Sequence, residues 1–225
     1  MEFLHRGWAF LLATVISLGA SSLSGEMPGA ESGEKGTQQV DEVSELAKGN
    51  KIVIHYHRFD GDYEQAGLWT WDGRSEKDPD MQEVLFSGET DFGVYFVLDP
   101  SDFGSDDSEA DRVGFIPRLR RDWNQKDGGD RYWNPAMGRE VWLIGNNPQV
   151  FTERPDISPK ISAAYIDSHN QLTLRLSHPI PVVNVHSESF IVKHSDGGII
   201  PLKGAEPQRP NYDGTTNFVS ITTDP

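Results

Sequence analysis

Trp69 and Trp71 stand two positions apart in the short segment LWTW. Because side chains alternate along a β-strand, residues two apart point to the same face, and the two indoles would lie side by side. The C–H face of a pyranose ring can stack on an indole while the hydroxyl groups at its rim form hydrogen bonds. The spacing is therefore typical of a sugar-binding platform. Burial of both rings in a core is the alternative, and spacing alone does not separate the two.

A charged, glycine-containing loop, RDWNQKDGGDR, supplies a third candidate ring. It contains Trp123 together with Lys126, Asp127 and Asp130. An exposed indole beside hydrogen-bond donors and acceptors suits the vicinal hydroxyl groups of a sugar. The alternative is a solvated hairpin loop closed by its own salt bridges.

The elements that must position these side chains are predicted to be strands. Short segments rich in β-branched and aromatic residues are separated by Gly, Pro, Asn and Asp, which favours an all-β fold with antiparallel β-sandwiches. Segments of this kind before residue 152 are KIVIHYHRF, AGLWTW, EVLFSG, FGVYFVL, RVGFIPRLR, RYWN and REVWLIG. Those after it are ISAAYID, QLTLRLS, SFIVKH, GIIPLK and NFVSITT.

Composition divides the chain into four parts. Residues 1–24 hold a positive charge and an apolar run too short to span a bilayer comfortably, which predicts an export signal. Residues 25–50 are small, polar and acidic, and are predicted to be a disordered linker with a turn or two of helix near its end. We expect a β-sandwich over 51–152 and a second, truncated β-rich module over 153–225.

The bulk composition excludes several classes of function. The net charge of −15 disfavours binding to nucleic acid or to anionic membranes, but it does not disfavour a neutral ligand. The chain has no cysteine, so no disulfide, thiolate nucleophile or zinc–thiolate site can form. His55 and His57 share a strand face without a further paired-histidine motif, and the acidic run over 99–111 lacks the EF-hand spacing. We therefore expect no metal and no cofactor.

No catalytic motif stands out. The chain has 35 acidic residues, but no spacing singles out a pair of carboxylates for glycoside hydrolysis, and there is no G-x-S-x-G sequence. A chain of 225 residues, less its export signal, also leaves no room beside these β-rich segments for a (β/α)₈ barrel of about 250 residues. We expect a protein that binds without catalysing.

The order and spacing of the motifs closely resemble the pullulanase-associated domain, or family 41 carbohydrate-binding module, over about 51–152. The similar stretches are IVIHYHRFDGDYEQAGLWTWDG, FGVYFVL, VGFIPRLRRDWNQKDGGDRYW and EVWLIGNNPQVF. The resemblance implies an antiparallel β-sandwich that binds starch, glycogen and pullulan. It also implies that sugar is contacted by Trp69, Trp71, Trp123, Lys126 and an aspartate best matched by Asp130. Pro117 and the short loop after Lys126 depart from the family pattern, which leaves Asp127 as the other choice.

Residues 160–225 resemble, more weakly, the β-rich module that follows this domain in type I pullulanases. The resemblances together predict the non-catalytic N-terminal part of a pullulanase-like enzyme. Such a protein would be secreted, would be a monomer, and would have an α-glucan as its partner. It would contact neither nucleic acid nor, after signal cleavage, a membrane. A β-rich secreted adhesin or protein-interaction module without carbohydrate binding is the alternative.

Overall fold

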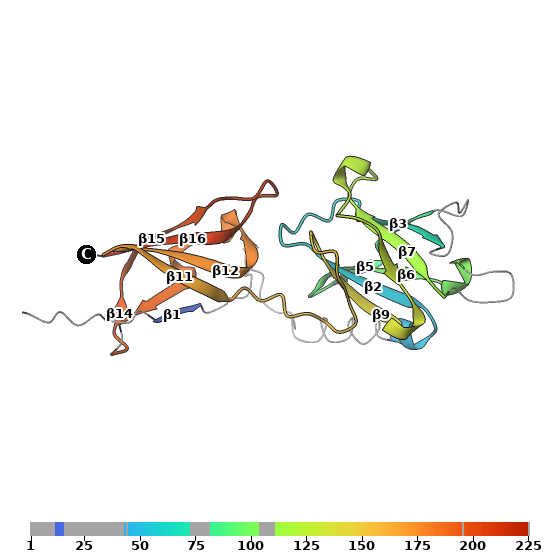
Figure 1. Cartoon of the computed structure of the whole chain (residues 1–225), viewed down its shortest axis with the longest axis horizontal. Coiled ribbons are helices and arrows are strands. Elements are labelled where there is room, and N and C mark those ends of the chain that lie inside the picture. The colour runs from blue at the N-terminus through green and yellow to red at the C-terminus, as the bar shows by residue number, and fades with distance from the viewer. Residues whose placement is uncertain are drawn as a thin grey trace, which may run out of the picture. The chain divides into compact units, whose positions relative to one another are not determined.

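The computed structural model describes residues 12–15, 43, 45–72, 82–103, 111–194 and 196–224. They belong to two compact units, one within residues 27–156 and the other formed by residues 157–225 with 1–26 (Figure 1). The predicted export signal and linker fall mostly outside the described residues. The exceptions are the strand β1 (Leu12–Val15) and a helical stretch at residues 43 and 45–48, near the end of the predicted linker.

The unit within 27–156 contains two β-sheets. The first has the strand order β10 (Val150–Phe151), β9 (Glu140–Ile144), β2 (Ile52–His57), β6 (Gly93–Leu98) and β5 (Gly88–Thr90). The second has the order β4 (Gln82–Leu85), β3 (Gly67–Asp72), β7 (Val113–Arg118) and β8 (Arg131–Trp133). Among the described residues of this unit, three short 3₁₀ helices lie between strands: η1 (Pro100–Phe103), η2 (Trp123–Gln125) and η3 (Pro135–Met137).

One continuous core lies between these sheets, which makes the unit a β-sandwich. Ile54 and Phe96 come from the first sheet, while Leu68, Phe115 and Trp133 come from the second, and all five are fully buried. Buried and partly exposed residues alternate along β6, whereas β2 and β7 are buried along most or all of their length, and each sheet turns one face toward the shared core. The predicted all-β fold is confirmed, with one refinement: β2 pairs with β9 in parallel, and the other pairs are antiparallel.

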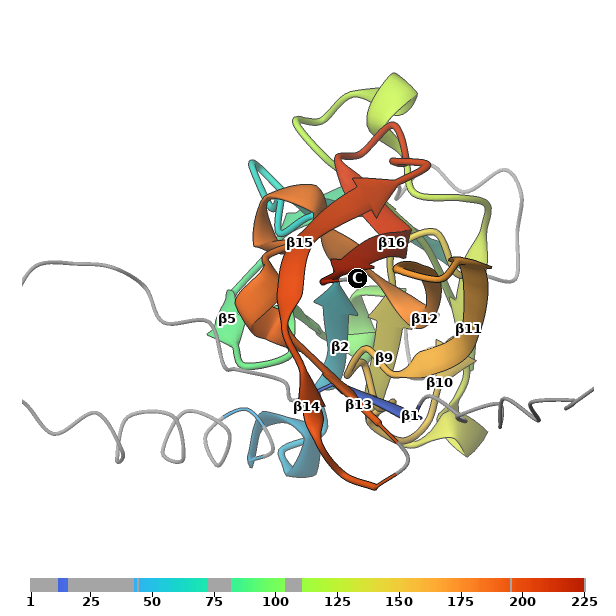
Figure 2. The same cartoon turned by 90° about the vertical axis from the view of Figure 1, so that its left-hand side faces the viewer.

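The other unit is also built from strands (Figure 2). Its main sheet has the order β11 (Ile161–Ser168), β12 (Gln171–Pro181), β16 (Thr215–Thr223) and β15 (Leu202–Gln208). A smaller sheet joins β1 to β13 (Phe190–Lys193) and β14 (Ile199–Ile200), and two 3₁₀ turns, η4 (Val182–Asn184) and η5 (Ser187–Ser189), precede β13. Leu174, Val192 and Ile221 belong to its separate core. No helix in the described ranges is long and apolar enough to cross a membrane.

The carboxylate of Asp99 joins the end of β6 to the start of β2. It accepts hydrogen bonds from Lys51 Nζ, from Ser101 Oγ at 2.6 Å and from Ser101 N at 3.0 Å. These bonds, the one from Lys51 above all, lower the pKa of Asp99 to about 2. Because the folded state favours the charged form, the carboxylate stabilises the fold above its unfolded pKa of about 3.9, and this contribution is lost as the pH falls through 2.

We therefore expect Asp99→Asn to lower the free energy of unfolding by the same amount at about pH 7 and pH 5, and by less at about pH 3. Urea unfolding of both proteins at the three pH values measures this. Ser101→Ala, which removes one of the weaker contributors, should show the same trend with a smaller amplitude. A difference that grows toward low pH would contradict the assignment.

Candidate functional site

The outer face of the second sheet carries the predicted platform residues. Leu68 and Thr70 of β3 are fully buried on the core side, so Trp69 and Trp71 point away from the core. In the register of β3 with β7, Trp69 lies opposite Ile116, and Trp71 lies opposite Gly114. Trp69 and Trp71 therefore share one face, as their spacing predicts.

Trp123 reaches the same face from the loop between β7 and β8. Its ring centroid lies 5.4 Å from that of Trp69, and the two ring planes meet at 70°. Trp123 is 48% exposed and Trp69 is partly exposed. These two rings, which we call the indole pair, form an angled aromatic surface open to solvent.

A tight turn returns the loop toward the sheet. Asp122 N donates to Leu119 O at 2.9 Å, and the two central residues, Arg120 and Arg121, have φ values of 53° and 56°. This left-handed geometry matches the twist of a hairpin but is unfavourable for residues other than glycine. The Asp122 side chain then accepts from Asn124 N at 2.9 Å and caps η2, the turn that carries Trp123.

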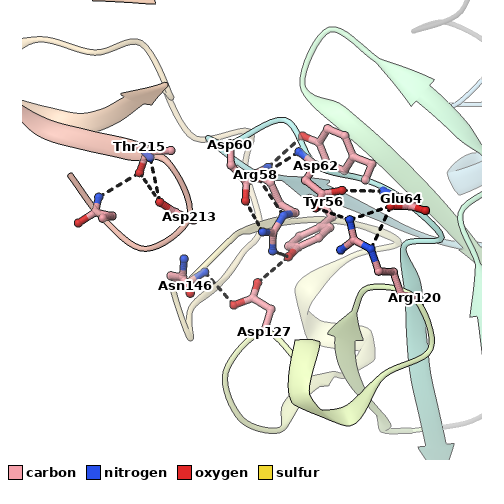
Figure 3. Close-up of polar contacts among 12 residues, drawn as sticks. Tyr56, Arg58, Asp60, Asp62, Glu64, Arg120, Asp127, Asn146, Asp213 and Thr215 are labelled. Atoms are coloured by element: carbon pink, nitrogen blue, oxygen red, sulfur yellow. Dashed lines mark hydrogen bonds and ion pairs between the residues drawn. The ribbon is translucent and has the colours of Figure 1, made fainter. Parts of the chain in front are cut away.

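The strained turn is anchored by Arg120. Its guanidinium donates to Asp62 Oδ2 at 2.9 Å and to Glu64 Oε2 at 3.0 Å (Figure 3). Although burial opposes it, the hydrogen bonds from Glu64 N and from Arg120 lower the pKa of Asp62, so this carboxylate stays charged near neutral pH. The loop after β2 therefore helps to fix the loop that carries Trp123.

Trp71 differs from expectation. The resemblance implies that Trp71 contacts sugar, for which its ring must be open to solvent, but Trp71 is only 8% exposed. The ring lies flat against the backbone of Gly114, where a Cβ atom would fall 2.2 Å from its Cε2 atom, and Tyr132 packs against it edge-on at 5.9 Å. The prediction that Trp71 is exposed is therefore wrong, because the strand opposite has no side chain to hold the indole away from the sheet.

Asp127 is a structural residue. Its carboxylate is 4% exposed and accepts from Tyr56 Oη and from Asn146 N, each at 2.8 Å (Figure 3). Arg131 Nη2 lies 3.5 Å from the same carboxylate, and Arg131 Nη1 donates to the Asp127 carbonyl at 2.8 Å. Because these partners occupy the buried carboxylate, it cannot reach a ligand in this conformation.

Tyr56 is the donor that holds Asp127 from the core side. Burial, with the Asp127 carboxylate next to it, raises the pKa of the Tyr56 phenol, which therefore stays protonated and donates its hydrogen. Arg58 Nη1 also donates to Tyr56 Oη at 3.2 Å, and Arg58 pairs with Asp60. The network links β2 to Asp127, near the C-terminal end of the loop that carries Trp123.

The other two predicted residues are exposed. Lys126 follows η2, and its backbone bridges to Arg118; Asp130 precedes β8 and accepts weakly from Tyr132 Oη at 3.5 Å. All five residues predicted to contact sugar therefore lie on the outer face of one sheet or in the loop beside it. Sequence reasoning missed Arg118 and Glu83, whose side chains lie beside the indole pair. The sequence gives no sign that Arg118 and Glu83 pair with each other, because that contact depends on the register between strands.

His55 and His57 each lie beside an acceptor within the protein. His55 Nε2 lies 2.8 Å from Glu140 Oε1, and its ring stacks on Trp142 at 5.2 Å, while His57 Nδ1 lies 2.6 Å from Phe92 O. Within the described ranges, no three or more His, Asp or Glu side chains are grouped so that they could hold a metal ion.

Comparison with known families identifies the same stretch of chain. Residues 50–152 match the model of a family described as "bacterial pullanase-associated domain". This range coincides with the stretch whose motifs carried the resemblance, and it contains the indole pair, Lys126 and Asp130. Domains of this family bind carbohydrate and are not catalytic.

Solved structures similar to this chain include family 41 carbohydrate-binding modules from streptococcal virulence factors, described for α-glucan recognition. The identity is 19%, with a TM-score of 0.33, over 46% of this chain and 47% of that one. PulA from Klebsiella oxytoca is 18% identical, with a TM-score of 0.38, over 78% of this chain and 19% of that one. A streptococcal virulence factor described for α-glucan binding is 18% identical, with a TM-score of 0.33, over 78% of this chain and 75% of that one. The chain therefore spans less than half the length of the first of these structures.

Because Asp127 is buried and Asp130 is exposed, their replacement should change the free energy of unfolding by different amounts. Asp127→Ala leaves Arg131 buried without its carboxylate and Tyr56 without an acceptor, so we expect a loss of about 3–5 kcal/mol in the free energy of unfolding. Asp130→Ala, at an exposed position, should change it by less than about 0.5 kcal/mol. Urea unfolding of both variants measures the difference, and equal effects would contradict the assignment of Asp127.

The contact of Trp71 with Gly114 can be tested by overpacking. Gly114→Ala places a methyl group where the indole now lies, and we expect it to cost about 1–3 kcal/mol in the free energy of unfolding. Gly129→Ala is the matched control, because nothing lies within 4 Å of a Cβ atom there. If the two variants are equally stable in urea unfolding, the indole does not rest on Gly114.

Proposed function

We propose that residues 50–152, which match the model of the bacterial pullanase-associated domain, bind α-glucans such as starch, glycogen and pullulan by stacking sugar rings on the indole pair. One observation carries the proposal: Trp69 and Trp123 lie 5.4 Å apart with their planes at 70°, and Trp123 is 48% exposed. The family match supports a carbohydrate ligand, and the geometry of the two rings supports an α-glucan among carbohydrates.

The angle between the rings favours a curved ligand. Successive glucose units of an α-1,4-linked chain turn relative to one another, because the axial bond at C1 bends the chain into a helix. Two indole rings that meet at an angle can follow such a bend, because each ring can stack on one of two neighbouring glucose units. An extended β-1,4-linked chain is flat and would suit coplanar rings instead. The indole pair therefore favours an α-glucan.

Charged groups around the pair would select the orientation of the sugar. We assign Lys126 and Asp130 to this role, because both are exposed and belong to the loop that carries Trp123. An ammonium group donates to hydroxyl oxygens, and a carboxylate accepts from hydroxyl hydrogens. Trp71 supports the surface from beneath the outer layer, and any contact it makes with sugar requires its ring to become exposed.

The domain acts by binding alone. It would keep an attached or neighbouring hydrolase close to its substrate by raising the local concentration of glucan. We place the protein outside the cell as a monomer, in keeping with the export signal predicted for residues 1–24. Its net charge of −15 does not disfavour this neutral ligand.

The test is affinity electrophoresis in gels containing amylopectin or pullulan, with hydroxyethylcellulose as the flat-chain control. Trp123→Ala should weaken binding by about 5- to 150-fold, the loss expected from one stacked aromatic ring, and should leave the thermal unfolding temperature nearly unchanged. Tyr165→Ala is the matched control, because Tyr165 is 49% exposed and lies in the other unit.

The outcomes separate the alternatives. Retardation by α-glucan without release of reducing sugar supports the proposal. Release of reducing sugar would indicate an enzyme. Absence of retardation in every gel would favour the adhesin or protein-interaction alternative.

A further inference from the structure

A buried guanidinium lies against both rings of the indole pair. The Arg118 Cζ atom is 4.9 Å from the ring centroid of Trp69 and 4.5 Å from that of Trp123. Its side chain is only 6% exposed. A planar cation over two aromatic faces is attracted by both quadrupoles, and the attraction strengthens when the cation is shielded from water. Arg118 is therefore in contact with both rings at once.

Glu83 holds this guanidinium in place. Arg118 Nε donates to Glu83 Oε1 at 2.9 Å, and Arg121 Nε lies 3.3 Å from Glu83 Oε2. The Glu83 side chain is itself 14% exposed. Gly67 lies between the two in the sheet, and a Cβ atom there would come within 2.9 Å of the Glu83 carboxylate. The missing side chain at Gly67 leaves the space in which this ion pair forms.

The two rings have no common backbone support. Trp69 belongs to strand β3, whereas Trp123 belongs to η2, in a loop that leaves the sheet after Arg118. Each indole could turn about its own side-chain bonds. Apart from their edge contact with each other, the two rings share Arg118 as a neighbour on the outer face.

We propose that Arg118, fixed by Glu83, is a positioning residue that sets the angle between the rings of Trp69 and Trp123 and thereby the affinity of the site for curved α-glucan. The effect of Arg118 on glucan affinity rests on the function proposed above, whereas its effect on the ring angle rests on the geometry alone. Arg118 acts through the rings, since a side chain that is 6% exposed offers little surface to a sugar.

The experiment measures ring geometry and binding separately. Two indoles this close give an exciton couplet in the far-ultraviolet circular dichroism spectrum, and its amplitude depends on the angle between them. Trp123→Phe should abolish the couplet and so identify it. Arg118→Lys keeps the charge but loses the planar fork, and Glu83→Gln keeps the volume but loses the anchoring charge. Both should change the couplet and weaken retardation by amylopectin about 3- to 10-fold.

A matched control is available on the same face of the sheet. Arg112 lies 3.7 Å over the ring of Tyr132, which is a cation–π contact outside the indole pair. Arg112→Lys should leave both the couplet and the retardation as in the wild type. Thermal unfolding of each variant shows whether it folds. Because Arg118 is buried, Glu83→Gln decides the question if Arg118→Lys does not fold.

The outcomes distinguish this inference from the proposed function. If the wild type is retarded, and folded Arg118→Lys and Glu83→Gln keep both the couplet and the retardation, Arg118 does not position the rings. If no glucan retards the wild type but the couplet changes in these variants, Arg118 positions the rings and the proposed ligand is wrong. A changed couplet with unchanged retardation overturns the link between ring angle and affinity.

Discussion

A single buried carboxylate, that of Asp127, holds together the part of the fold on which the candidate site depends. It receives hydrogen bonds from Tyr56 on one sheet and from the backbone of Asn146 beyond β9, and it lies beside the buried Arg131. A charge so far from water is tolerated only when donors surround it. Because Tyr56 and Asn146 are distant from Asp127 in the sequence, these bonds tie the loop that carries Trp123 to β2 and to the turn after β9.

The outer face of the second sheet shows how absent side chains shape a surface. Gly114 lets the ring of Trp71 lie flat on the neighbouring strand, and Gly67 leaves room for the carboxylate of Glu83. The Trp71 ring and the Glu83 carboxylate occupy the space that these two glycines leave, whereas Trp123 and, in part, Trp69 remain exposed to solvent.

Much of the fold could be predicted from the sequence, since strand signals are local. The segments around Ile54, Leu68, Phe96 and Phe115 alternate or carry β-branched and aromatic residues, and each forms a strand that faces the core. The parallel pairing of β2 with β9 could not be predicted in this way. Their pairing depends on which edges meet after collapse, and no local pattern encodes that.

By itself, the sequence predicted which residues would contact a sugar, and it determined which of them share a strand face. Alternation along β3 follows from backbone geometry, so Trp69 and Trp71 had to point the same way. Only the tertiary structure decided which ring is covered, which aspartate is buried and which cation lies against the indoles. Each of these depends on the residue opposite in another strand or loop: Gly114 for Trp71, Tyr56 for Asp127 and Glu83 for Arg118. Register between strands is a long-range property, and it brings together side chains that the linear chain keeps far apart.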